Sequence, residues 1–150
     1  MKLHGLFVGT VGLLLVSANA PADDAAKDLE KLRGTWLLVS AERDGKKLPE
    51  DEVKKTKISF EKDAFVFPDA KEIGTSHKGI IKVYPDKTPK WMDSTDTTET
   101  GKDSLSLGLY ALDGDDYKVC FAPPGKPRPT TFSSKPGSGH ILQVWKRAKE

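Results

Sequence analysis

The residue whose type and setting best suit chemistry is Arg128, which stands between Pro127 and Pro129. The two proline rings restrict the neighbouring backbone to extended forms, so the direction of the arginine is held. A long cation on a stiffened segment suits a carboxylate or a phosphate group. The alternative is a structural salt bridge to an acid earlier in the chain, for example Asp93 or Asp96. The pattern leaves both interpretations open.

The residues that catalysis would need are not arranged for it. Cys120 is the single cysteine, and the sequence ties neither His77 nor His140 to it, although a thiol nucleophile needs a base beside it. No glycine-x-serine-x-glycine elbow follows a predicted strand, and serines in a glycine-rich loop, such as Ser138, are ordinary turn formers. We therefore expect no enzyme activity, and we expect Cys120 to be a small packed side chain.

Metal binding is also disfavoured. Asp113, Asp115 and Asp116 could bind calcium, but the later ligands of a calcium loop are missing, in particular a glutamate at the twelfth position. A hairpin turn at Asp113-Gly114 explains these residues without a metal. With two histidines and one cysteine after residue 20, a zinc site is not expected either. We expect neither a metal nor a cofactor.

The charged residues are unevenly distributed along the chain. Its formal charge of +2 does not indicate a nucleic-acid partner. The segment Asp86–Asp116 contains eight acids and three lysines, whereas Tyr117–Lys149 contains seven Lys or Arg and no acid. Within the second segment, Phe121–Gly139 holds five of the ten prolines. This is either chance along a solvated surface or a basic patch that faces an anionic ligand or an envelope polymer.

The first twenty residues have the three parts of a secretory signal peptide. Lys2 is a basic start, Leu6–Val16 is an apolar run, and Ala18-Asn19-Ala20 is a small-x-small cleavage pattern. We expect cleavage after Ala20 or Ala22 and an exported protein, either periplasmic or extracellular. No later run is long and apolar enough to span a membrane, which needs about 20 residues.

Short strands must position the candidate residues. Asp24–Arg33 has the pattern of a helix that ends at Gly34, and Pro49–Lys55 has the pattern of a second short helix. The runs that predict strands are Thr35–Glu42, Lys57–Glu61, Ala64–Phe67, Ser76–Tyr84, Lys90–Thr95, Ser104–Leu112, Tyr117–Ala122, Thr130–Ser133 and His140–Arg147. Because strands and helices do not alternate, the class is all-β, either a sandwich or a small closed barrel.

Two features resemble the lipocalins. The first predicted strand opens with Gly34-Thr35-Trp36 after a short helix, and the last strand ends with Trp145-Lys146-Arg147. In lipocalins an arginine from the last strand packs across the tryptophan of a glycine-x-tryptophan motif and closes the base of the barrel. The resemblance implies that Gly34, Trp36 and Arg147 do so here. A guanidinium stacked on a desolvated indole contributes about 1–2 kcal/mol.

The chain also resembles a family of exported lipocalin-like domains of uncharacterised function from planctomycete bacteria. The motifs are glycine-apolar-tyrosine ending at Tyr110, Asp-Gly-Asp, a cysteine strand, Arg-Pro-Thr from Arg128 to Thr130, and Lys-Pro-Gly-Ser-Gly. They lie between about Leu29 and Arg147. The resemblance implies a closed or nearly closed antiparallel lipocalin-like barrel of about eight strands over residues 29–149, with residues 21–28 as a short lead. It implies no catalytic residue.

We expect such a barrel to bind a small apolar or amphipathic ligand, unless its own side chains fill the interior of so short a chain. The candidate ligand-binding residues are Arg128, Trp91, Tyr110 and Thr130. Trp91 could line a pocket or stack on a sugar ring, but the sequence favours a plug at one end of the barrel. The inward side chains are expected to include Phe60, Phe65, Phe67, Leu107 and Phe121. If these fill the interior, the chain is instead a structural domain, or one that binds a protein or an envelope polymer through its basic loop.

Overall fold

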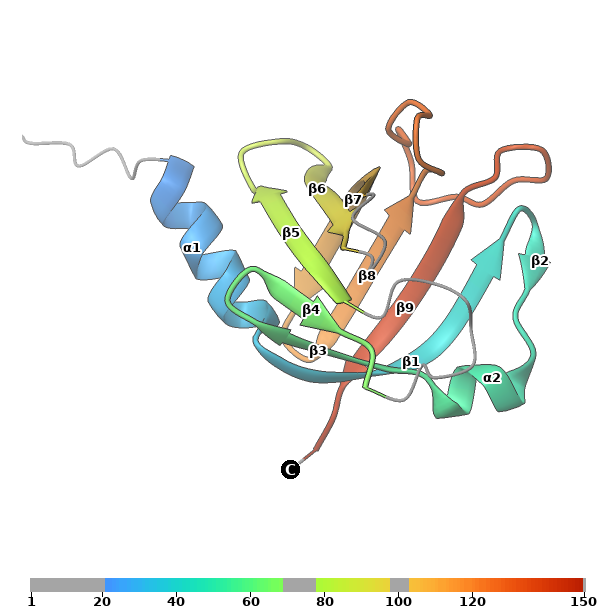
Figure 1. Ribbon diagram of the computed structural model, residues 1–150, viewed down its shortest axis with the longest axis horizontal. Coiled ribbons are helices and arrows are strands. Elements are labelled where there is room, and N and C mark those ends of the chain that lie inside the picture. The colour runs from blue at the N-terminus through green and yellow to red at the C-terminus, as the bar shows by residue number, and fades with distance from the viewer. Residues whose placement is uncertain (1–20, 69–77, 98–102, 150) are drawn as a thin grey trace, which may run out of the picture.

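The computed structural model describes residues 21–68, 78–97 and 103–149, which form an antiparallel β-barrel (Figure 1). The predicted signal peptide and His77 lie outside the described residues. The strands are β1 (Gly34–Arg43), β2 (Lys46–Lys47), β3 (Lys57–Glu61), β4 (Ala64–Val66), β5 (Lys78–Tyr84), β6 (Lys90–Asp96), β7 (Ser104–Asp113), β8 (Asp116–Phe121) and β9 (Ile141–Arg147). Strands β3 to β9 pair in sequence, and β1 joins β3 to β9, so the sheet closes. The all-β barrel prediction is confirmed.

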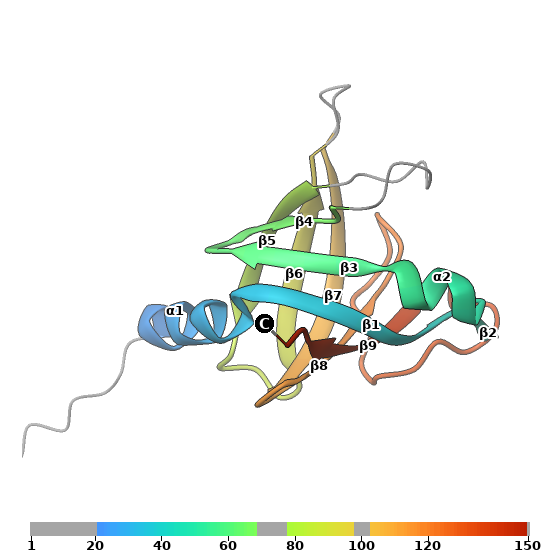
Figure 2. The same cartoon turned by 90° about the horizontal axis from the view of Figure 1, so that it is seen from below.

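Two helices flank the barrel. α1 (Pro21–Leu32) has acids in its first turn and a lysine in its last, which complements the helix dipole. α2 (Glu50–Lys55) begins after Pro49 and buries Val53. Figure 2 shows α1 at one end of the barrel and α2 away from it. We call the end that α1 covers the base and the opposite end the mouth.

Aromatic side chains fill the interior near the base. The rings of Trp36 and Tyr117 meet edge to face at 5.6 Å between centroids, and those of Phe60 and Tyr117 at 6.0 Å. Phe65 extends the group, at 6.5 Å from Phe60. Met92 is completely buried in the same core, and its sulfur accepts a hydrogen bond from the Tyr117 hydroxyl at 3.4 Å. Because these side chains come from strands on different sides of the barrel, their packing holds the walls together.

Two glycines let phenylalanine rings lie close to the backbone of the inner wall. Gly79 is opposite Phe65 in the sheet, and Gly108 is opposite Phe121. A Cβ atom on Gly79 would lie 2.6 Å from the Phe65 ring and 2.3 Å from the carbonyl oxygen of Thr95. A side chain at either glycine would therefore displace a ring that belongs to the interior.

We expect Gly79→Ala to lower the free energy of unfolding by about 1–3 kcal/mol, because the methyl group overpacks the inner wall against a backbone oxygen. Urea unfolding measures the change. Lys82→Ala, at an exposed position of the same strand, is the control and should change stability by less than about 0.5 kcal/mol. Equal effects of the two substitutions would contradict the packing of Phe65 on Gly79.

The alternating leucines of β7 face outward, so the expectation that Leu107 points inward is wrong. Leu107 and Leu109 alternate with residues of the interior core, and Leu109 pairs with Cys120 on the outer face. Leu109 is nevertheless only 1% exposed. The β8–β9 loop covers it, as shown by the Cys120 thiol, which donates to the carbonyl oxygen of Ser133 in that loop. Alternation reveals that one face is buried, but not what covers it.

One further expectation differs from the structure. Thr130–Ser133 is not a strand but part of the β8–β9 loop, where the Ser133 amide donates to the nearby carbonyl of Thr131. The outer side of β1 is not covered within the described residues, because Leu37 is 40% exposed and Val39 is 56% exposed. Apolar residues on both faces of a strand therefore did not mean burial on both faces here.

Candidate functional site

Arg128 lies on the outer wall of the barrel. Its Nη2 atom is 2.6 Å from Oδ1 of Asp93, and its Nη1 atom donates to the carbonyl oxygens of Gly108 and Met92 at 2.8 and 3.3 Å. The Arg128 and Asp93 side chains are only 16% and 18% exposed. Of the two interpretations drawn from the sequence, the structure contains the internal salt bridge to Asp93.

Trp91 lies beside this ion pair, on the outer face of β6. Its ring centroid is 4.5 Å from the Arg128 guanidinium carbon and 5.0 Å from the Lys87 ammonium nitrogen. Tyr84 approaches the indole edge to face at 6.2 Å and donates its hydroxyl to Asp93 at 3.1 Å. The expectation that Trp91 plugs one end of the barrel is therefore wrong. We call these five residues the outer cluster.

We expect Arg128→Ala to destabilise the fold by about 1–3 kcal/mol, because it leaves Asp93 and two carbonyl groups without their donor. The measurement is thermal unfolding, with Lys126→Ala as the control. Lys126 is exposed in the same loop, and its loss should change stability by less than about 0.5 kcal/mol. An unchanged melting temperature for Arg128→Ala would show that these contacts do not hold the loop.

At the base, the Arg147 guanidinium stacks on Trp36, with 4.3 Å between its central carbon and the indole centroid. Nη1 donates to the carbonyl oxygen of Arg33 at 2.8 Å, and Nη2 to that of Lys31 at 2.5 Å. Gly34 follows with φ of 108°, a conformation that only glycine adopts readily. The last strand, the first strand and the end of α1 therefore meet at one guanidinium.

The base also contains a buried carboxylate. Asp28 of α1 is 3% exposed and accepts hydrogen bonds from Lys90 Nζ and Tyr110 Oη, each at 2.7 Å, while the Lys31 ammonium lies 3.6 Å away. Burial raises the pKa of Asp28, but the two hydrogen bonds and the lysine charges outweigh it and hold the pKa below its usual value. Burial and the Asp28 carboxylate raise the pKa of Tyr110, so this hydroxyl remains a donor.

We expect Asp28→Asn to lower the free energy of unfolding by about 1–3 kcal/mol at neutral pH. Because the pKa of Asp28 is lower in the folded than in the unfolded protein, the carboxylate stabilises the fold above an unfolded pKa of about 4. This contribution is lost as the pH falls through the folded pKa. Urea unfolding should therefore show the two proteins converging in acid, and a constant difference would contradict the role of the charge.

The interior near the mouth is lined by polar side chains. Ser94 pairs with Ser106, and Asp96 pairs with Ser104, on the same face of the sheet as the core residue Met92. All four are half-buried, whereas Met92 is not exposed at all. Burial raises the pKa of Asp96. These inward side chains therefore keep some contact with solvent near this end of the barrel. We call these four residues the polar wall.

Trp145 is the next inward residue of β9 after Arg147, toward the mouth. It is 1% exposed, and its ring centroid lies 6.4 Å from that of Phe67. Its indole N–H has no acceptor among the described residues. A buried donor left in this state costs about 1–3 kcal/mol. It is therefore a point in the interior where an acceptor atom of a ligand would be stabilised.

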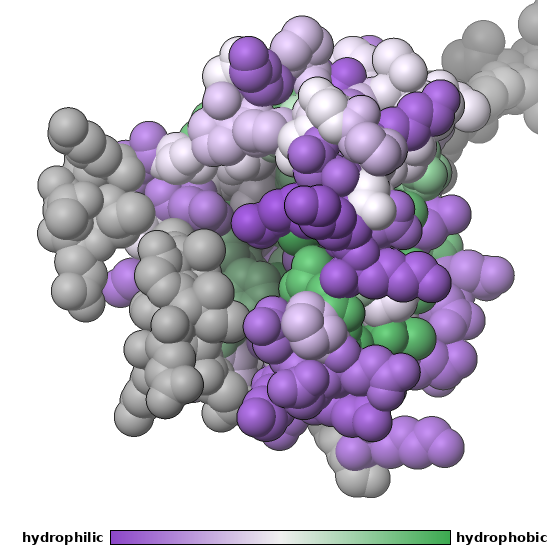
Figure 3. Space-filling model, turned by 90° about the vertical axis from the view of Figure 1, so that its right-hand side faces the viewer, coloured by the Kyte–Doolittle hydropathy of each residue, from purple (hydrophilic) through white to green (hydrophobic). Residues whose placement is uncertain are grey.

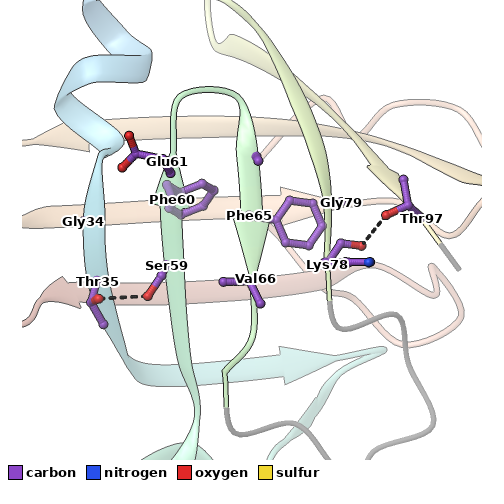
Figure 4. Close-up of a pocket in the computed structure, with 11 residues that line it drawn as sticks. Gly34, Thr35, Ser59, Phe60, Glu61, Phe65, Val66, Lys78, Gly79 and Thr97 are labelled. Atoms are coloured by element: carbon purple, nitrogen blue, oxygen red, sulfur yellow. Dashed lines mark hydrogen bonds between the residues drawn. The ribbon is translucent and has the colours of Figure 1, made fainter. Parts of the chain in front are cut away.

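Two hollows open on the surface, and each is lined partly by residues of the core: Phe60 and Phe65 in the first, and Leu38, Ala41 and Val53 in the second. One, of about 670 Å³, crosses β1, β3, β4 and β5, where Thr35 and Ser59 share a hydrogen bond of 2.8 Å (Figure 4). The other, of about 570 Å³, lies between α2 and β1 and is lined by Val39 and Leu142 among others. The face that carries α2 is mostly hydrophilic, with apolar side chains exposed in its middle (Figure 3).

The four candidate ligand-binding residues do not form one site. Arg128 and Trp91 share the outer cluster. Tyr110 is buried at the base and bonded to Asp28. Thr130 is exposed on the β8–β9 loop. The structure thus separates residues that the sequence could only group by type.

The other candidate chemical groups are engaged in structural contacts. Burial raises the pKa of the Cys120 thiol, which opposes the thiolate that a nucleophile needs. Asp115 pairs with Arg147 at 3.1 Å, and Asp116 pairs with Lys146 at 3.0 Å. Within the described ranges, no three His, Cys, Asp or Glu side chains are placed to hold a metal ion.

Comparison with protein families, with curated proteins and with solved structures found no match for this chain. Neither α1 nor α2, the helices of the described part, is long and apolar enough to cross a membrane. The function must therefore be inferred from the geometry of the chain itself.

Sequence reasoning missed Asp28, although a signal was present. It lies three residues after Ala25 and four before Leu32, on the apolar side of α1. An acid at such a position predicts a buried partner. The partners themselves, Lys90 and Tyr110, could not be found in this way, because only the packing of α1 on the barrel brings them to it.

Proposed function

We propose that this protein is an exported, non-catalytic binding domain with a lipocalin-like barrel, and that it binds a small amphipathic ligand at the mouth. One observation carries the proposal, namely the contrast between the two halves of the interior. Side chains near the base, such as Trp36 and Met92, are completely buried. Inward side chains near the mouth, such as Ser94 and Ser106, keep contact with solvent.

The mouth offers both kinds of surface that an amphipathic molecule needs. The polar wall supplies three hydroxyl groups and one carboxyl group. Phe67 and Phe121 are half-buried and pack against the core, so they supply apolar surface. The N–H of Trp145 supplies a donor without an acceptor among the described residues. A ligand with an apolar part and several polar atoms would satisfy these groups together.

The filled base limits the size of the ligand. The ring contacts from Trp36 through Tyr117 and Phe60 to Phe65 occupy the interior below the mouth. A long chain that runs the length of the barrel would have to displace them. We therefore expect a short or compact ligand, held by the upper part of the barrel only.

A second candidate is an interaction domain that binds a protein or an envelope polymer through the β8–β9 loop. It is favoured by the exposed Lys126 and Lys135 and by Trp91, which is 36% exposed on the same wall. Arg128 is bound within the protein, so the loop lysines and Lys87 would supply the charge. In this case the partner would be anionic.

Binding at the mouth can be tested with N-phenyl-1-naphthylamine, an apolar probe whose fluorescence rises in an apolar site. We expect saturable binding to the purified protein. Ser106→Phe should weaken it about tenfold or more, because the ring fills the space beside the polar wall. Leu105→Phe is the matched control, since Leu105 is the neighbouring residue on the outer face and is 49% exposed. It should leave the affinity unchanged.

Native mass spectrometry of protein purified from its own host provides the second readout. A retained small molecule, lost on Ser106→Phe, is the expected result. Equal effects of the two phenylalanine substitutions, or no probe binding and no retained molecule, would overturn binding at the mouth. Retention of an anionic polymer that depends on Lys126 and Lys135 would support the interaction domain instead.

A further inference from the structure

The barrel carries a pair of donors at its base that is independent of the helix it binds. Lys90 opens β6 and Tyr110 lies in β7, and the two are direct cross-strand partners. The Lys90 ammonium lies 5.7 Å from the centroid of the Tyr110 ring. Neighbouring strands therefore hold a cation and a hydroxyl side by side on the inner face, whatever occupies the space in front of them.

The group in front of them is a single carboxylate oxygen. Lys90 Nζ and Tyr110 Oη both lie 2.7 Å from Oδ2 of Asp28. Two donors that converge on one oxygen, one of them charged, form a short and strong carboxylate contact. The Asp28 side chain is only 5% exposed, and the Lys90 side chain 37%, so solvent reaches the site from the lysine side.

Apart from the contacts of Asp28, the hydrogen bonds that join this helix to the barrel among the described residues lie at its C-terminal end. Arg147 binds the carbonyl groups of Lys31 and Arg33, and the Trp36 indole N–H donates to that of Leu32 at 2.7 Å. Before these residues, the partly buried Ala25 and Leu29 pack against the core, and Asp28 is buried between them in the sequence. Displacement of residues 24–29 would therefore leave the contacts that close the base at Trp36 in place.

We propose that Lys90 and Tyr110 form a carboxylate-binding site, that Asp28 occupies it as an internal ligand, and that a short aliphatic carboxylate can replace Asp28. The exchange conserves both hydrogen bonds and the ion pair, because one carboxylate takes the place of another. The aliphatic part of the ligand takes the position of Leu29 and Ala25 against the core. This site is at the opposite end of the barrel from the polar wall and does not depend on ligand binding at the mouth.

Competition with Asp28 sets the affinity. A tethered group has an effective concentration in the millimolar range or above, so an external carboxylate binds the native protein weakly. Removal of the internal carboxylate removes this competitor. Asp28→Ala should therefore gain affinity for carboxylates even though it loses stability. If Asp28 had only a structural role, Asp28→Ala would lose stability and would not gain affinity for carboxylates.

Calorimetric titration with octanoate tests the proposal on the purified protein. We expect Asp28→Ala to bind octanoate about tenfold or more tightly than the native protein. Adding Lys90→Met to Asp28→Ala should abolish the gain, and octanol, which lacks the carboxylate, should show none. Asp24→Ala is the matched control, because Asp24 lies one turn earlier in α1 and pairs only with Lys27 among the described residues, at 3.5 Å. It should bind octanoate like the native protein.

If Asp28→Ala does not fold, hydrogen exchange of the native protein tests the proposal. Saturating octanoate should speed amide exchange in residues 24–28 and leave exchange in β6 and β7 unchanged, and Tyr110→Phe should reduce the effect. No gain in affinity for a folded Asp28→Ala, a gain that survives Lys90→Met, or unchanged exchange in α1 would each overturn the proposal.

Discussion

The guanidinium of Arg147 stacks on Trp36 and donates to two carbonyl groups at the C-terminal end of α1. Trp36 lies near the start of the first strand, and Arg147 ends the last. Their contact therefore lies where the sheet closes on itself, at the Trp36–Arg147 pair of the β1–β9 ladder. It also satisfies carbonyl groups that the end of a helix leaves without partners. Closure of the barrel and docking of the helix thus depend on the same side chain.

A second layer of packing lies outside the barrel. The β8–β9 loop covers Leu109 and Cys120, and the Arg128–Asp93 ion pair fixes the loop to the outer face of β6. The prolines stiffen the loop, and the arginine binds backbone carbonyls as well as a carboxylate. The basic loop is therefore part of the folded structure, and the charges it can offer a partner are those of its exposed lysines.

The pKa of a buried carboxyl group is shifted in opposite directions at the two ends of the interior. Asp28 at the base has two hydrogen-bond donors and two lysines nearby, and its pKa is lowered despite burial. Asp96 at the mouth is subject to burial alone, and its pKa is raised. The contacts of Asp28 therefore favour its charged form, whereas burial of Asp96 disfavours its charged form.

The sequence by itself determined the all-β class, most strand positions and the likeness of Gly34, Trp36 and Arg147 to a barrel closure, because side-chain alternation and turn residues are local signals. It also placed Asp93 among the partners that Arg128 could have. Only the tertiary structure decided that the leucines of β7 face outward and that Trp91 lies on the outer wall. It alone brought Asp28 to Lys90 and Tyr110. Alternation of side chains along a strand defines its two faces, but it does not say which face the barrel encloses. An ion pair between residues 62 positions apart in the sequence depends on how the helix packs on the strands.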